Sequence, residues 1–126
     1  MLTLVIIFVT GLFTMFASFF GQKSLAKYLG LTGILASLVC LNLHLGIGVQ
    51  FLGFFEMSPL AKMMTVLTLV ILFFIFLVSG NYEKEYDWSA TLSLMLFSTC
   101  GAILLYGYSN LLTLFLGIEI LSIPLY

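Results

Sequence analysis

Four stretches of about 20 apolar residues follow one another along this chain, and each is long enough to cross a lipid bilayer as a helix. The hydrocarbon core is about 30 Å thick and a helix rises about 1.5 Å per residue, which sets this length. The stretches are Leu2–Phe20, Leu25–Gly46, Leu60–Ser79 and Ala90–Ser109. The sequence therefore predicts an all-α integral membrane protein.

A fifth apolar stretch, Leu111–Tyr126, corresponds to only about 24 Å of helix. We therefore expect about five transmembrane helices, with the last one cut short. The first stretch lacks both the basic segment and the small-residue cleavage site of a signal peptide, so we expect it to be retained as a helix.

Composition supports a membrane protein. Only 7% of the 126 residues are charged, with four Lys, no Arg and five acids, whereas a soluble domain carries about 25%. So few charges cannot cover a surface that faces water. The net charge of −1 gives no indication of a nucleic-acid partner.

The lysines indicate an orientation. Lys23 and Lys27 lie near the first connection and Lys84 in the third, whereas Lys62 lies near the second. Because Lys and Arg collect on the inner side of a membrane, the first and third connections are expected inside. The N-terminus is then outside.

Small residues in the second stretch, Gly30, Gly33 and Ser37, recur at helical spacing. Ser98 and Ala102 form a similar pair in the fourth. Such residues let membrane helices approach closely, and we interpret both sets as packing positions.

Cys40 and Cys100 lie far apart within apolar stretches and are interpreted as packing residues, because no C-x-x-C pair or His/Cys cluster indicates a metal site. His44, at the end of the second stretch, is expected to hydrogen-bond a neighbouring helix. Trp88 is a candidate interfacial anchor.

Glu119 is the residue that points to chemistry. It lies about 12 Å into the fifth stretch, where a charge costs about 2.5–3.5 kcal/mol on insertion scales. An intramembrane carboxyl group is therefore a candidate for proton transfer, although a structural hydrogen bond between two helices would also explain it. Ser122 follows at i+3 on the same face of the helix, and Pro124 should weaken the helix behind the carboxyl group. Both features favour a hydrated internal path over a helix that faces lipid. No lysine lies at the centre of a stretch, so either a basic partner comes from another polypeptide or the carboxyl group is neutral.

The residues from Leu111 to Tyr126, which follow Asn110, have the pattern L-x-x-L-x-L-G-x-E-x-x-S-x-P-x-Y. This pattern closely resembles the fifth helix of subunit 2 of NADH–ubiquinone oxidoreductase, an antiporter-like subunit of respiratory complex I. The resemblance extends over residues 83–126, including Cys100-Gly101, and is only general before residue 80.

The resemblance implies three leading helices in residues 1–80 and, in residues 81–126, the first two helices of a five-helix repeat. It implies that Glu119 is the carboxylate of a proton-translocation pathway and pairs with a lysine on a later helix. We expect a companion chain, from a split gene, to supply that lysine. Glu56 corresponds only loosely to a family acid, and we interpret it as a solvated loop residue.

The resemblance further implies a subunit of an H⁺-translocating NADH:ubiquinone reductase, without redox catalysis or a cofactor site in this chain. NADH, flavin, iron–sulfur clusters and ubiquinone are expected in other subunits. The expected partners are other membrane-arm subunits and the lipid bilayer. The expected location is the mitochondrial inner membrane, with the bacterial plasma membrane as the alternative.

Three other classes of membrane protein agree less well with the sequence. A small drug/proton antiporter carries its essential Glu in the first span, whereas Leu2–Phe20 has no charge. A structural accessory subunit does not explain the pattern around Glu119. A multisubunit cation/proton antiporter shares the ancestry but is normally one continuous chain.

Overall fold

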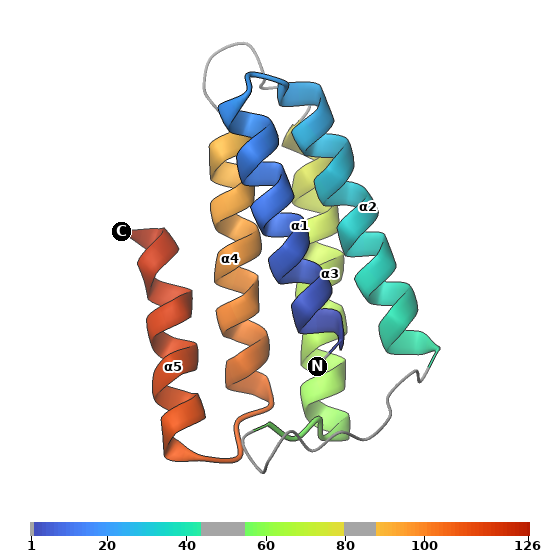
Figure 1. The fold of residues 1–126 in the computed structure, drawn as a ribbon. Coiled ribbons are helices and arrows are strands. Elements are labelled where there is room, and N and C mark those ends of the chain that lie inside the picture. The colour runs from blue at the N-terminus through green and yellow to red at the C-terminus, as the bar shows by residue number, and fades with distance from the viewer. Residues whose placement is uncertain (1, 44–54, 80–87) are drawn as a thin grey trace.

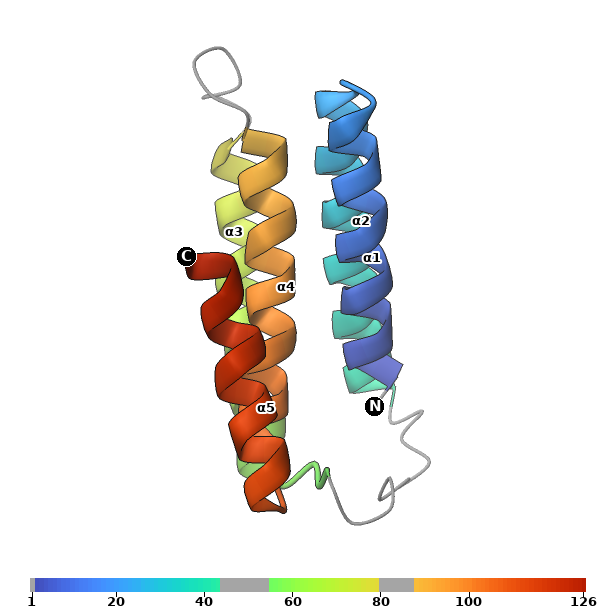
Figure 2. The same ribbon diagram turned by 60° about the vertical axis from the view of Figure 1, so that its left-hand side comes forward.

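Five α-helices form an up-and-down bundle in the computed structural model, which describes residues 2–43, 55–79 and 88–126 (Figure 1). Successive helices run in opposite directions, and α5 ends partway along α4 (Figure 2). The helices are α1 (Leu2–Phe19), α2 (Lys23–Asn42), α3 (Pro59–Val78), α4 (Trp88–Tyr106) and α5 (Leu111–Ser122), followed by the short 3₁₀ helix η2 (Ile123–Leu125).

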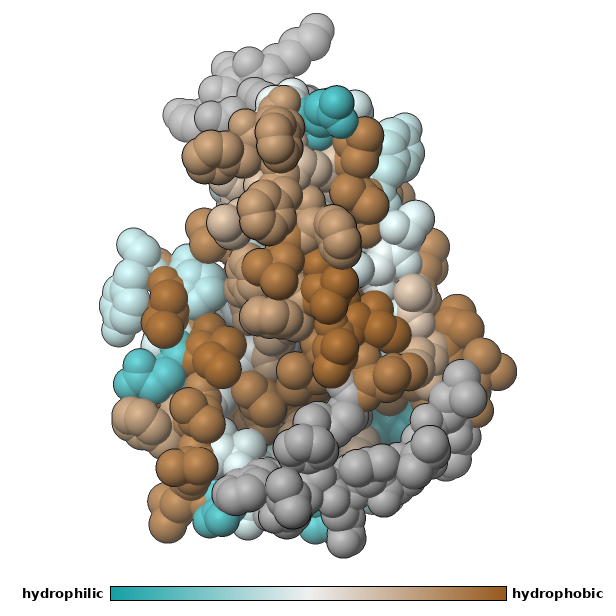
Figure 3. Space-filling view, in the orientation of Figure 1, coloured by the Kyte–Doolittle hydropathy of each residue, from teal (hydrophilic) through white to brown (hydrophobic). Residues whose placement is uncertain are grey.

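The membrane-protein prediction is confirmed by the length and composition of the helices. Four of them, α1 to α4, are long and apolar enough to cross a bilayer. Hydrophobic side chains dominate the visible face of the bundle, and hydrophilic ones lie toward its two ends and in a patch over α5 (Figure 3). The protein is therefore a multi-pass membrane protein.

Helix boundaries follow local sequence signals. Ser58 caps α3, because its Oγ accepts a hydrogen bond from the Ala61 N–H at 3.1 Å, and Pro59 begins the helix, one residue before the predicted Leu60. α4 stops at Tyr106, three residues before the predicted Ser109. The reason is a turn whose Gly107 carbonyl accepts a hydrogen bond from the Glu56 N–H at 2.8 Å.

α4 is the central helix of the bundle. It packs against α1, α2, α3 and α5, and it is more buried than the other long helices. Large fully buried side chains fill the space between the helices: Ile7, Ile34, Leu69, Phe76, Leu96 and Ile103. At the end of the bundle where α4 begins, the hydroxyl groups of Ser18 and Ser89 lie 2.8 Å apart and join α1 to α4.

The predicted close packing of α2 is confirmed. Gly30 lies against the Phe76 ring of α3 and Gly33 lies against the Thr10 side chain of α1, so a Cβ at either position would collide. Ser37 is fully buried. In α4 the predicted Ala102 is buried, but the closest approach occurs at Gly101, where a Cβ would lie 2.7 Å from the Leu121 Cα. Small residues thus set the spacing between helices.

The two ends of the bundle carry different lysines. Lys27 lies in the first turns of α2, at the end where α3 stops and α4 begins, and Lys62 lies near the start of α3 at the opposite end (Figure 1). Lys84 and His44 lie outside the described residues.

The orientation predicted from these lysines can be tested by single cysteines at Gln22 and Glu56, which lie at opposite ends, in a chain without Cys40 and Cys100. We expect a membrane-impermeant maleimide to label Glu56→Cys in sealed membranes and Gln22→Cys only after permeabilisation. The reverse labelling pattern would contradict the predicted orientation.

Replacing Gly101 with Ala should destabilise the bundle by about 1–3 kcal/mol relative to Gly11→Ala, because only the first Cβ overlaps a neighbouring backbone. A Cβ at Gly11 meets the Phe97 ring at an ordinary 3.4 Å. Both variants gain the same helix propensity, so the difference isolates the overlap. Thermal unfolding in detergent measures it, and equal midpoints would refute the close α4–α5 contact.

Candidate functional site on the outer face of α5

The position of Glu119 is set by how α5 packs on α4. α5 begins at Asn110, whose side chain accepts a hydrogen bond from the Leu111 N–H at 3.0 Å. Two glycines then bring the antiparallel helices together: Gly101 lies against Leu121, and Gly117 lies against Leu105. Because the helices are antiparallel, each step forward along α5 corresponds to one step back along α4, and both contacts agree on this alignment. Glu119 therefore lies at the level of Ile103.

This register refines the depth expected from the sequence. Ile103 is six residues from Phe97, the middle residue of α4, so Glu119 lies about 9 Å from the middle of that helix along its axis. Glu119 is thus well inside the apolar part of the bundle and closer to the end at which α5 begins.

Glu119 points away from α4. Thr113 and Gly117 are the buried residues of α5 and mark the face that packs on α4. Glu119 follows Gly117 by two residues, or about 200° around the helix, and it is exposed. Leu112 and Phe115, 59% and 60% exposed, share this outer face, and a hydrophilic patch lies over α5 amid hydrophobic surface in Figure 3.

Glu119 therefore does not face the interior of this bundle. The carboxylate of Glu119 faces outward, where a partner can reach it. Among the residues that the structure describes, no side chain forms an ion pair or hydrogen bond with this carboxylate. Lys27 and Lys62 lie on α2 and α3, near opposite ends of the bundle.

Ser122 and Pro124 shape the backbone behind Glu119. The Ser122 hydroxyl donates to the Glu119 backbone carbonyl at 3.1 Å, which also accepts from the Ile123 N–H, so Ser122 stabilises the helix end and does not bind the carboxylate. The α-helix ends at Ser122 and tightens into η2. Pro124 has no N–H to continue the α-helical ladder, and the predicted weakening is therefore confirmed.

The neighbouring carbonyl of Leu121 accepts a bond from the Ser98 hydroxyl of α4 at 3.4 Å. Sequence reasoning gave Ser98 a packing role only and missed this bond. It also missed which way Glu119 points, although Thr113 and Gly117, two small residues at i and i+4, marked the packed face.

Other residues noted in the sequence lie elsewhere. Glu56 is exposed just before α3, as expected for a loop acid. Phe55 beside it is buried, pairs through its backbone with Tyr108 and lies against Gly107, thereby joining the start of α3 to the α4–α5 turn. Cys40 is half-buried and Cys100 buried, both as free thiols.

Comparison with known proteins agrees with the family resemblance of the sequence. No protein-family model matches the chain. NADH-quinone oxidoreductase subunit N of Cytophaga hutchinsonii is 33% identical over 131 aligned residues, covering 98% of this chain and 28% of that protein. The subunit of the same name from Chloroflexus aggregans is 36% identical over 109 residues, covering 84% of this chain and 22% of that protein.

The chain spans less than a third of the length of these curated relatives, both of which are bacterial. The alignment nevertheless includes almost every residue of the chain, so the relationship extends beyond the segment whose motif indicated it. The chain is therefore homologous to part of the proteins named NADH-quinone oxidoreductase subunit N.

Proposed function

We propose that this chain forms part of a membrane-arm subunit of a proton-pumping NADH:quinone oxidoreductase, in which Glu119 is a carboxylate of the proton-translocation pathway. The observation that carries the proposal is a carboxyl group deep on an apolar helix face that turns away from its own bundle. The relatives named NADH-quinone oxidoreductase subunit N support the assignment to the complex.

The surroundings of Glu119 require a polar cover. An ionised carboxylate that faces lipid hydrocarbon costs several kcal/mol, and intramembrane acids accordingly face protein or water. Leu112, Phe115 and Glu119 together make an outer face that one further helix can cover. The remaining part of the subunit, on a companion chain or on a continuation of this one, supplies that helix and its basic group in our proposal.

A lysine opposite Glu119 would make the site switchable. Each charge favours the ionised form of the other when the two are close, and separation in an apolar environment favours both neutral forms. When the lysine moves away, its pKa falls and it releases its proton. The pKa of Glu119 rises at the same time, so the carboxylate takes up a proton from another donor. Charge shifts that accompany quinone reduction in other subunits would drive the separation.

The helix end behind Glu119 suits this role. The change from α5 to η2 leaves backbone carbonyls outside the regular α-helical ladder, and such groups lie at membrane depth only where protein or water satisfies them. Water held there would connect Glu119 to the next proton carrier. NADH, flavin, iron–sulfur clusters and quinone would be bound by other subunits, so this chain contributes proton transfer alone.

The location follows from the complex. We place the protein in an energy-converting membrane, the mitochondrial inner membrane in our proposal and the bacterial plasma membrane if the chain is bacterial like its relatives. In either membrane the other membrane-arm subunits are its partners.

Replacing Glu119 with Gln should leave the complex assembled and strongly reduce protons pumped per NADH oxidised, because the amide keeps the shape but cannot ionise. Proton uptake and NADH oxidation in sealed vesicles measure this ratio. Glu56→Gln is the matched control, since Glu56 is also exposed but lies outside the apolar part of the bundle. An unchanged ratio in Glu119→Gln would contradict the proposal.

Mass spectrometry of the native membrane complex should find this chain with complex I subunits. It should also find the remaining three quarters of the subunit, either on this polypeptide or on a companion that carries lysine-bearing helices. Recovery of the chain among unrelated membrane proteins would instead favour an accessory role.

A further inference from the structure

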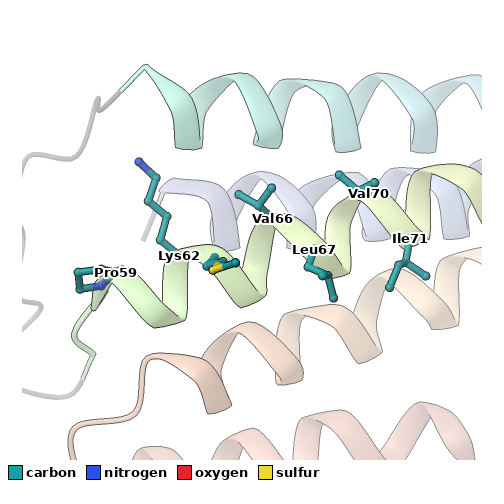
Figure 4. Close-up of a pocket in the computed structure, with 7 residues that line it drawn as sticks. Pro59, Lys62, Val66, Leu67, Val70 and Ile71 are labelled. Carbon is teal, nitrogen blue, oxygen red and sulfur yellow. The ribbon is translucent and has the colours of Figure 1, made fainter.

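The outer side of α3 is the open surface of a single helix. A shallow recess on it is lined by residues of α3 alone, among them Val66, Leu67 and Val70 (Figure 4). The contact between α4 and α5 is different, because side chains and backbone of both helices meet there directly after Glu119. This contact is where the structure says more about Glu119.

The Leu121 carbonyl lies where the helical hydrogen bonding of α5 changes. In an α-helix this carbonyl would accept a bond from the Leu125 N–H, four residues on. Leu125 belongs to η2, and a 3₁₀ helix instead joins residue i+3 to residue i, as the Tyr126 N–H does with the Ile123 carbonyl at 3.3 Å. The Ser98 hydroxyl of α4 donates to the Leu121 carbonyl at 3.4 Å and so replaces that bond of the α-helix.

Ser98 acts together with Gly101, which lies three residues further along α4. Gly101 lies against the backbone of Leu121. The register that aligns these two residues also aligns Ser98 with Pro124, at the point where α5 gives way to η2. α4 therefore holds two successive peptide groups just after Glu119, one by close packing and the other by a hydrogen bond.

We propose that Ser98 is a positioning residue for Glu119 and acts through the backbone of α5. Gly117 holds α5 two residues before the carboxylate, and the Ser98 bond holds it two residues after, on the side opposite the Glu119 side chain. Without the bond, only packing keeps the last turn of α5 on α4, so that turn can shift and move the carboxyl group relative to what faces it. The inference rests on the function proposed for Glu119, because its position matters to pumping only if the carboxylate meets a cation.

The test measures how fast Glu119 reacts with dicyclohexylcarbodiimide in the intact complex, with peptide mass spectrometry to locate the label. The reagent is apolar and attacks protonated carboxyl groups, so a carboxylate that a nearby cation keeps ionised reacts slowly. In Ser98→Ala, Glu119 should react about threefold faster at neutral pH, near the lower end of the effect of one hydrogen bond, because this bond is long. Protons pumped per NADH oxidised should fall in the same variant.

Two further variants of α4 make the result specific. Ser93→Ala removes a hydroxyl that donates to the Ala90 carbonyl within α4 at 2.7 Å, so the reaction of Glu119 should be unchanged. Ser98→Thr keeps a hydroxyl at the position of the bond and should restore the parent rate. The proposal is overturned if Ser98→Ala labels Glu119 no faster than Ser93→Ala does, or if Ser98→Thr is altered as much as Ser98→Ala.

The Glu119→Gln variant separates the role of Ser98 from the role of Glu119. If Glu119→Gln pumps normally, the proposed function fails, and the positioning role that rests on it fails too. If Glu119→Gln pumps poorly while Ser98→Ala keeps the labelling and pumping of the parent, only the role of Ser98 is refuted.

Discussion

The close contact between the backbones of α4 and α5 determines the direction in which Glu119 points. In a membrane the hydrophobic effect does not hold helices together, so packing of small residues and hydrogen bonds between helices take its place. Gly101 and Gly117 provide two such contacts in one register, and the Ser98 hydroxyl adds a bond to the Leu121 carbonyl. This contact fixes the rotation of α5 about its axis. With Gly117 on the inside, Glu119 can only be on the outside.

The same constraint explains how the bundle treats its other polar groups. Buried hydroxyl groups such as those of Thr14, Ser37 and Thr65 donate to carbonyls of their own helices at 2.7–2.9 Å, so they require no partner from elsewhere. Glu119 has no such local solution, because its own helix offers it no cation. Among the described residues, the Glu119 carboxylate has no partner, whereas the three hydroxyl groups named above are satisfied within their own helices. An interaction outside this bundle best explains the difference.

Much of this fold could be predicted from the sequence because helix length and charge placement follow directly from the thickness of the bilayer. The starts of α3 and α5, Pro59 and Leu111, lie within one residue of the starts of the predicted stretches. The early end of α4 was not predicted, since it depends on Glu56 and Phe55 meeting the turn at Gly107 from a distant part of the chain. Gly101 was likewise missed as the closest contact, because spacing alone cannot tell which of several small residues faces a neighbour.

Glu119 was found from the sequence because a carboxylate in an apolar helix is costly wherever it points. Its direction required the structure, because only the packing of Gly117 on α4 shows that Glu119 faces outward. The proton path that we propose would therefore run along the outer face of α5. A high-resolution structure of the intact complex, showing what lies against the outer face of α5, tests this account most directly. We predict a lysine from the remaining part of the subunit, in contact with the Glu119 carboxylate directly or through water. Lipid acyl chains against Leu112, Phe115 and Glu119 would contradict the account.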